Sequence, residues 1–156
     1  MPSLLLFAPC QSVAYDAKDQ TASLIGVFQG FTVSVVKAKD GAEKADKEEL
    51  LKGGIPLHWV AFAMWRKLPE DDGKQYTQFC ELVRPSGKPS AKASLKFEMT
   101  KGFQRNTINI NGFPVDEEGD YHLKLLLQEA DKEPVFITEY PISITYEIGG
   151  TFISRR

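Results

Sequence analysis

Residues 121–129 read Tyr-His-Leu-Lys-Leu-Leu-Leu-Gln-Glu, and their alternation is the clearest indication of the fold class. Every second side chain is apolar (Tyr121, Leu123, Leu125 and Leu127), and the intervening ones are polar apart from Leu126. A period of two indicates a strand with one buried face. The second half of the chain contains five or six such segments separated by turn residues, and this pattern predicts a small antiparallel β-sandwich.

The same kind of pattern on either side of residues 121–129 predicts about eight strands in all. Their approximate ranges are 3–8, 21–28 with a continuation over 31–36, 56–68, 75–84, 93–100, 104–111, 121–129 and 135–148. Pro9 is expected to end the first strand. Gly26 and Gly30 predict a bulge or bend where the second strand passes from one sheet to the other. Pro141 predicts an edge strand or a bulge, because proline cannot donate to a ladder.

The segment 56–68 is the most apolar of the predicted strands. One face carries Trp59, Ala61, Ala63 and Trp65, and the other carries His58, Val60, Phe62, Met64 and Arg66. Because both faces contain large apolar side chains, we expect a central strand that is covered on both sides.

The segment 37–54 has a different character. It is rich in charged helix formers and contains only Leu50 and Leu51 as large apolar anchors near its end. We expect either a charged loop or a short, poorly anchored helix, since an isolated polar helix of this length is marginal.

Length and composition narrow the class of protein. A chain of 156 residues fits one domain, which we place at residues 1–150, with a C-terminal tail at 151–156. The formal net charge of −2 disfavours nucleic-acid binding. No apolar run is long enough to span a membrane as a helix. The two cysteines, Cys10 and Cys80, are interpreted as free thiols in a reducing compartment, which predicts a cytoplasmic location.

The segment 117–121, Glu-Glu-Gly-Asp-Tyr, resembles the turn that opens the penultimate strand of many immunoglobulin-like domains. In those domains a tyrosine ring packs at the corner and its hydroxyl bonds back to the chain. The resemblance implies an all-β, immunoglobulin-like sandwich with Tyr121 as the structural corner. The sequence departs from antibody domains because no cysteine follows Tyr121 and none lies in the second strand, so antibody-like function is not implied.

A second resemblance covers more of the chain. The stretches 4–10, 23–28, 65–66, 119–121 and 140–142 are together similar to an uncharacterised family of small bacterial single-domain proteins. This resemblance implies a bacterial source and assigns no functional residues.

The sequence offers two candidate ligand sites, and each has a competing structural interpretation. If successive strands alternate in direction, three acidic turns fall at one end of the sandwich and offer carboxylates to calcium, namely Asp16, Asp19, Asp71, Asp72 and Asp131. The competing interpretation is that aspartate simply suits turns. Trp59 and Trp65 share one strand face with two alanines between them, and an exposed pair of this kind would stack on sugar rings. The competing interpretation is that this face packs against the second sheet or under residues 37–54.

The sequence contains no nucleophile-elbow motif, no glycine-rich phosphate loop and no pair of closely spaced cysteines or histidines. We therefore expect no enzyme and no cofactor. The favoured hypothesis is a non-enzymatic interaction or accessory module, bacterial or phage-related, that contacts a protein partner or a second copy of itself. Leu126 and residues 151–153 of the tail are the candidate contact points. The alternative is a ligand-binding module that uses the tryptophan pair or the acidic turns.

Overall fold

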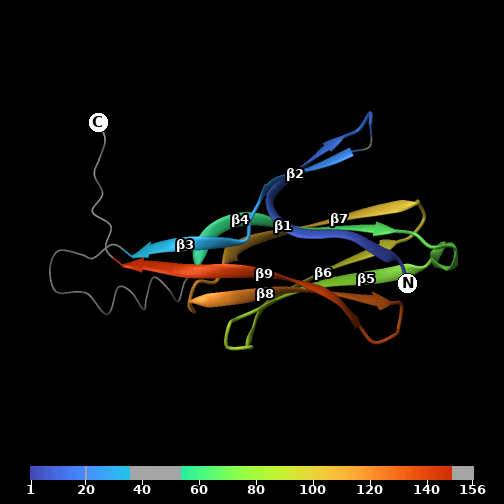
Figure 1. Cartoon of the computed structure of the whole chain (residues 1–156). Helices are drawn as coiled ribbons and strands as arrows, with labels where there is room; N and C mark the ends of the chain where they lie inside the picture. Colours follow the sequence, from blue (N-terminus) through green and yellow to red (C-terminus); the bar gives the residue numbers. More distant parts are fainter. Residues whose placement is uncertain (20, 36–53, 149–156) are drawn as a thin grey trace.

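The structure is a computed structural model that describes residues 1–19, 21–35 and 54–148. The predicted loop or helix at 37–54, apart from Gly54, and the predicted tail at 151–156 lie outside the described residues. The described part of the chain is all-β, and its elements form two layers (Figure 1). They are β1 (Ser3–Asp16), β2 (Thr21–Val27), β3 (Gly30–Val35), β4 (Ile55–Arg66), the 3-10 turn η1 (Pro69–Asp71), β5 (Gln75–Val83), β6 (Pro89–Glu98), β7 (Phe103–Phe113), β8 (Gly119–Glu129) and β9 (Val135–Ile148).

The strands form one four-stranded and one five-stranded sheet, which confirms the predicted sandwich. The first sheet has the order β2-β1-β4-β7, and the second has the order β3-β9-β8-β5-β6. The expectation of a wholly antiparallel arrangement is wrong, because β3 pairs with β9 in parallel. The described residues also form nine strands rather than about eight, since the predicted segment 21–36 divides into β2 and β3.

The chain changes sheets between β2 and β3, at the position that the glycines indicated. Gly26 has a φ of +64°, which a residue with a side chain adopts only with strain. Gly30 begins β3, and a Cβ atom there would lie 2.4 Å from the carbonyl oxygen of Ser143 on β9. The close approach of β3 to β9 therefore requires glycine at residue 30.

Pro9 does not end the first strand, contrary to the expectation. The carbonyl oxygen of Pro9 accepts a hydrogen bond from the backbone N–H of Phe28 at 3.4 Å, so Pro9 presents its backbone groups away from β4. The N–H that proline lacks would therefore not have joined the β1–β4 ladder. The strand continues to Asp16 and turns into β2.

Pro141 lies at an open edge, as predicted, although β9 is an inner strand of its sheet. The partner β3 pairs only from Ser143 onward, and the N–H of Ser143 donates to the carbonyl oxygen of Gln29 at 2.8 Å. Two residues earlier, the nitrogen of Pro141 faces the same side of β9, where no strand is paired in the described part of the chain. The missing N–H therefore leaves no ladder bond unmade.

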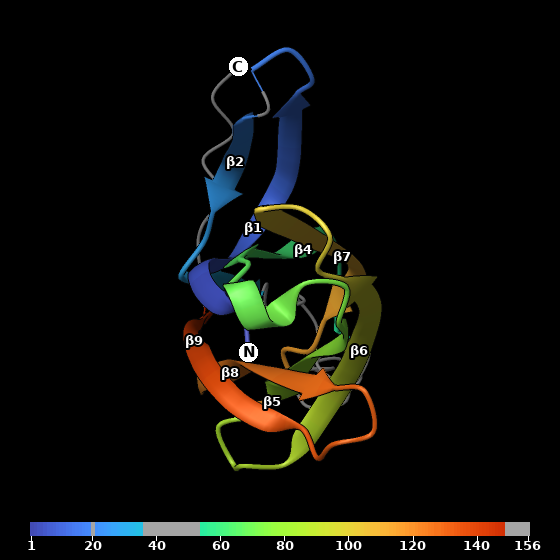
Figure 2. The ribbon, with the colours of Figure 1, turned by 90° about the vertical axis from the view of Figure 1, so that its right-hand side faces the viewer.

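Strand β4 is covered on both faces, as its sequence predicted. Its inner side chains belong to the main core between the sheets. On its outer face, Val60 and Phe62 form a second small core with Cys10, against which Val13 and Leu24 of the β1–β2 hairpin pack. Figures 1 and 2 show this hairpin rising from the sandwich, with its tip projecting away from the two sheets.

A buried polar link joins the two sheets within the main core. The indole N–H of Trp65 on β4 and the amide of Asn106 on β7 both donate to Oε1 of Gln78 on β5, each at 2.9 Å. The amide of Gln104 donates in turn to Oδ1 of Asn106 at 2.9 Å. Gln78 and Asn106 are fully buried, so each of these bonds compensates for the removal of a polar group from water.

Replacing Asn106 with leucine should destabilise the fold by about 1–3 kcal/mol, because Gln78 loses one donor and Gln104 loses its acceptor. The free energy of unfolding in urea measures this effect. Asn109→Leu is the matched control, since Asn109 lies on the same strand with its side chain exposed, and it should change the stability by less than about 0.5 kcal/mol. Equal stability of the two variants would contradict a structural role for the link.

Candidate functional site

The structure buries both tryptophans that the sequence offered as a sugar-binding pair. Trp59 is 1% exposed and Trp65 is 0% exposed, and both lie in the main core. The indole N–H of Trp59 donates to the carbonyl oxygen of Gly112 at 3.1 Å. The hypothesis of an exposed stacking platform on β4 is therefore wrong, because this face packs against the second sheet.

The acidic turns do not form the predicted calcium-binding pole. The carboxylate of Asp16 accepts the backbone N–H groups of Lys18 and Asp19 at the tip of the hairpin, which rises out of the sandwich and lies apart from the turn that holds η1 (Figures 1 and 2). Asp72 pairs with Lys67 at 2.6 Å, and Asp131 lies exposed in the β8–β9 turn. In the described ranges, no group of three or more histidine, cysteine, aspartate or glutamate side chains is arranged to hold a metal ion. The prediction fails because the first two strands leave the sandwich as a separate arm.

Asp71 has a structural role instead. Its fully buried carboxylate accepts the hydroxyl of Tyr76 at 2.7 Å and the backbone N–H of Leu68 at 3.0 Å, and it lies 3.3 Å from the α-amino group of Met1. Burial favours the protonated form, but these donors outweigh it and hold the pKa of Asp71 below its usual value. Asp71 therefore fixes the turn after β4 against the start of β5.

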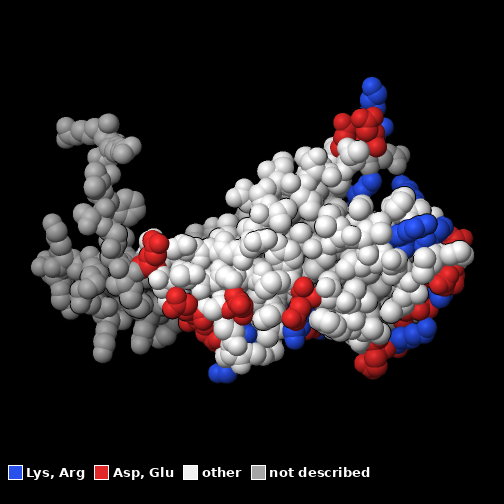
Figure 3. Space-filling view, viewed as in Figure 1, with Lys and Arg blue, Asp and Glu red and all other residues white. Residues whose placement is uncertain are grey.

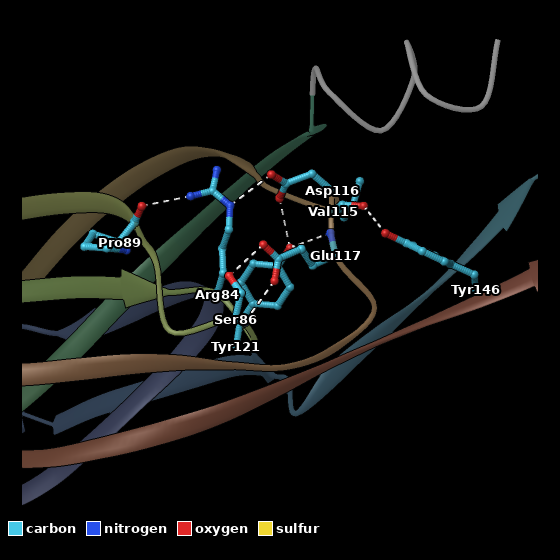
Figure 4. A network of polar contacts seen from close by, with 8 residues as sticks. All are labelled: Arg84, Ser86, Pro89, Val115, Asp116, Glu117, Tyr121 and Tyr146. Carbon is cyan, nitrogen blue, oxygen red and sulfur yellow. Dashed lines mark hydrogen bonds and ion pairs between the residues drawn. The ribbon is translucent and has the colours of Figure 1, made fainter. Parts of the chain in front are cut away.

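Tyr121 has the contacts expected of a structural corner, shown in Figure 4. Its ring is fully buried, and its hydroxyl accepts the backbone N–H of Glu117 at 3.1 Å while donating to Oδ1 of Asp116 at 3.0 Å. The other carboxylate oxygen of Asp116 accepts Nε of Arg84 at 2.9 Å. The hydroxyl of Tyr146 donates to the carbonyl oxygen of Val115. The bond from Arg84 holds the β7–β8 loop against the β5–β6 turn, and the bond from Tyr146 holds the same loop against β9.

The two thiols are free and buried. Burial raises the pKa of Cys80 to about 12, although the Gln78 amide, 3.7 Å from Sγ, acts in the opposite direction. Burial also raises the pKa of Cys10. Both groups therefore stay protonated at neutral pH, whereas a cysteine nucleophile reacts as the thiolate.

A cleft of about 420 Å³ opens between the two sheets on the side where β6 and β7 are the edge strands. Its walls are mainly apolar and include Trp59, Leu82, Phe113 and Leu123, with the small side chains of Ala91 and Ala93 on β6. The ion pair between Arg84 and Asp116 lies at its rim. The volume falls within the range of small-molecule sites.

A row of apolar side chains crosses the outer face of the five-stranded sheet. The cross-strand register places Phe79 of β5 opposite Leu126 of β8, and Leu126 opposite Phe136 of β9. Phe136 is 54% exposed, whereas Phe79 and Leu126 are half-buried. Leu126 was the exception in the alternation of residues 121–129, and the structure gives it two aromatic neighbours.

The sequence identified Leu126 but missed Phe79 and Phe136. Phe79 belongs to a segment that alternates regularly, and its outward position follows from the buried side chains of Gln78 and Cys80 on either side of it. Phe136 enters the row because the register shifts between Leu125 and Leu126, which the sequence does not show.

The sequence matches no protein-family model and no curated protein. None of the residues placed by the structure belongs to a helix long and apolar enough to cross a membrane.

The contribution of Asp71 to stability should depend on pH. Because the folded-state pKa lies below the unfolded value of about 3.9, this contribution is fully present at neutral pH and is lost as the pH falls through about 4 toward the folded pKa. Asp71→Asn should lower the midpoint of thermal unfolding at pH 7 and make it less sensitive to acid between about pH 5 and pH 3.

Asp72→Asn is the matched control for this experiment. The side chain of Asp72 is 71% exposed and pairs with Lys67 at the surface, and such pairs contribute about 0–1 kcal/mol. If both variants retain the wild-type dependence on pH, Asp71 does not have the assigned role.

Proposed function

We propose that this chain is a non-enzymatic interaction or accessory module of immunoglobulin-like type, acting on a protein partner in a bacterial or phage-related cytoplasmic setting. The bacterial and cytoplasmic parts of the proposal rest on the resemblance to the uncharacterised bacterial family and on the two free thiols. The interaction itself rests on the outer face of the five-stranded sheet.

The strand arrangement supports the immunoglobulin-like part of the proposal. Immunoglobulin domains pair their A, B and E strands in one sheet and their C, F and G strands in the other. Here β1, β4 and β7 are neighbours in one sheet, and β5, β8 and β9 are neighbours in the other. On this correspondence Tyr121 stands near the start of the F-like strand, where the tyrosine corner belongs.

The observation that best supports an interaction role is the apolar row of Phe79, Leu126 and Phe136. The face of a sheet that points to water is normally polar, and three large apolar side chains in register across it are an exception. Aromatic anchors surrounded by charged residues are typical of protein interfaces. The neighbouring residues of this face include Glu81, Lys124 and Glu139.

A second exposed apolar surface is less suited to a partner. Leu5 and Leu6, at 45% and 40% exposure, lie near the open edges of β1 and β9. Figure 3 shows that few charged side chains cover the middle of the face formed by β1, β3 and β9. Strand addition at the open part of β9 is limited, however, because Pro141 offers no N–H there.

Photo-crosslinking tests the proposed contact face. A benzoylphenylalanine that replaces Phe136 should form covalent adducts with a protein partner when the chain is expressed in its source organism. Phe103 is the matched control, since it is also 54% exposed but lies on β7 of the other sheet. Adducts that are absent at Phe136, or equally abundant at both positions, would refute the proposal. Mass spectrometry of the adducts identifies the partner.

The cleft favours a second candidate function, the binding of a small, uncharged and largely apolar molecule. Its walls offer the rings of Trp59 and Phe113, whose centroids lie 5.8 Å apart. The charged residues that line the cleft already have partners, since Arg84 pairs with Asp116 and Lys92 pairs with Glu81. The cleft is therefore better suited to an uncharged ligand than to an ionic one. This function takes the place of the tryptophan platform and the acidic turns as the ligand-binding alternative.

The neutral probe 1-N-phenylnaphthylamine tests the cleft. Its fluorescence should rise on binding and that of Trp59 should fall, because this ring lines the cleft. Ala93→Leu fills the cleft and should weaken binding about tenfold, or ~1.4 kcal/mol. Ser94→Leu adds a leucine on the opposite face of β6 and should leave binding unchanged. Equal binding by both variants, or no binding by the wild type, would exclude the cleft as the site.

A further inference from the structure

A row of alternating charges lies beside the apolar row on the outer face of the five-stranded sheet. Cross-strand register aligns one residue from each of four neighbouring strands, in the order Lys92, Glu81, Lys124 and Glu139. Lys92 pairs with Glu81 at 2.7 Å, and Glu139 lies 3.1 Å from the imidazole of His122. The Nζ atom of Lys92 also lies 4.6 Å from the ring centroid of Phe79, so the two rows touch.

The order of charges in this row is self-complementary. Read from β6 to β9 the signs are plus, minus, plus and minus, and read from β9 to β6 every sign is reversed. Two such rows that face each other in opposite directions therefore place unlike charges opposite each other at all four positions. A two-fold axis that runs parallel to the strands, between β5 and β8, produces this arrangement, as an isologous dimer requires.

We propose that the partner of this face is a second copy of the chain, packed sheet on sheet about this two-fold axis. This inference rests on the proposed function, since it names the occupant of the same face. Lys92 then lies opposite Glu139 of the second copy, and Glu81 lies opposite Lys124 of the second copy. Two sheets pack face to face at about 10 Å, with their strands within about 30° of each other, and this spacing suits such a contact.

The same axis brings the apolar row of one copy against the apolar row of the second copy. The apolar row continues on β6 as Ser94, which stands opposite Phe79 in the register. Around the axis, Leu126 faces Phe79 of the second copy, and Phe136 faces Ser94 of the second copy. The exposed ring of Phe136 therefore meets a small side chain, which leaves room for it between the sheets.

The size of this face predicts a weak dimer. Four strands span only about 14 Å across a sheet. A standard interface buries about 800 Å² per partner, so the two rows need the rest of the outer face to reach that area. The four charged residues are partly exposed, and Lys92, Glu81 and Glu139 already have partners within one chain, so the alignment of the row contributes more to orientation than to affinity.

Charge exchange with sedimentation equilibrium tests the proposal. The wild-type mass should rise from 17.5 kDa toward twice that value with increasing protein concentration. The rise should diminish in about 1 M salt, where the Debye length is about 3 Å. Lys92→Glu alone and Glu139→Lys alone should each abolish the rise, because each places like charges opposite each other twice in the dimer. The double variant should restore it.

Within one chain the double variant gains no ion pair. Lys92→Glu places a carboxylate beside Glu81, and Glu139→Lys places an ammonium beside Lys124, so restored dimerisation reports contacts between two chains. Lys101→Glu, in the exposed β6–β7 turn, makes the same change of charge elsewhere and should leave dimerisation intact. Circular dichroism confirms that each variant keeps its β-sheet spectrum.

The remaining outcomes separate this inference from the proposed function. A wild type that stays at 17.5 kDa at every concentration overturns the second copy as partner, and so does a dimer that the double variant fails to restore. Adducts between Phe136 and a different protein would then retain the interaction role while refuting self-association. The absence of both self-association and adducts overturns the two proposals together.

Discussion

Strand β4 is apolar on both faces, and the rest of the fold is arranged so that each of these faces is shielded from water. The five-stranded sheet shields the inner face, where Trp59 and Trp65 are buried. The outer face presents Val60 and Phe62, which the second sheet cannot reach. The chain meets this requirement by extending β1 past Pro9 and folding the β1–β2 hairpin so that Val13 and Leu24 pack over them.

That hairpin determines the course of the chain that follows. Since β2 pairs only with the last part of β1, the chain returns to the sandwich at Phe28, whose ring lies 4.7 Å from Phe31 and 5.8 Å from Trp59. It then enters the other sheet as β3, parallel to the end of β9. In the part of the chain that the structure describes, the first halves of β1 and β9 have no strand on one side, and Pro9 and Pro141 lie near the ends of these unpaired halves. The prolines are tolerated there because neither nitrogen faces a neighbouring strand.

The correct predictions were those that depend on residues close together in the sequence. The alternation of residues 121–129, the two apolar faces of 56–68 and the glycines at 26 and 30 all correctly indicated the sandwich and the point where the chain changes sheets. The parallel partner of β3 could not be predicted, because pairing between distant segments leaves no periodic signal. The acidic turns were grouped by assuming that consecutive strands alternate in direction within the sandwich, but the tip of the antiparallel β1–β2 hairpin lies on an arm that leaves the two sheets (Figures 1 and 2). The burial of the tryptophans followed from ordinary packing, whereas Phe136 required a register that only the folded chain shows.

The register shift in β9 determines which of its side chains lie on the outer face of the five-stranded sheet. Thr138 pairs with Leu125, so a regular ladder would place Ile137 opposite Leu126 and Phe136 opposite Leu127, on the core side. The extra residue reverses this assignment, because Leu126 meets Phe136 while Ile137 packs against the main core. In either register, one of the two side chains, Ile137 or Phe136, points outward. The bulge selects the aromatic one, and so completes an apolar row beside the charged row.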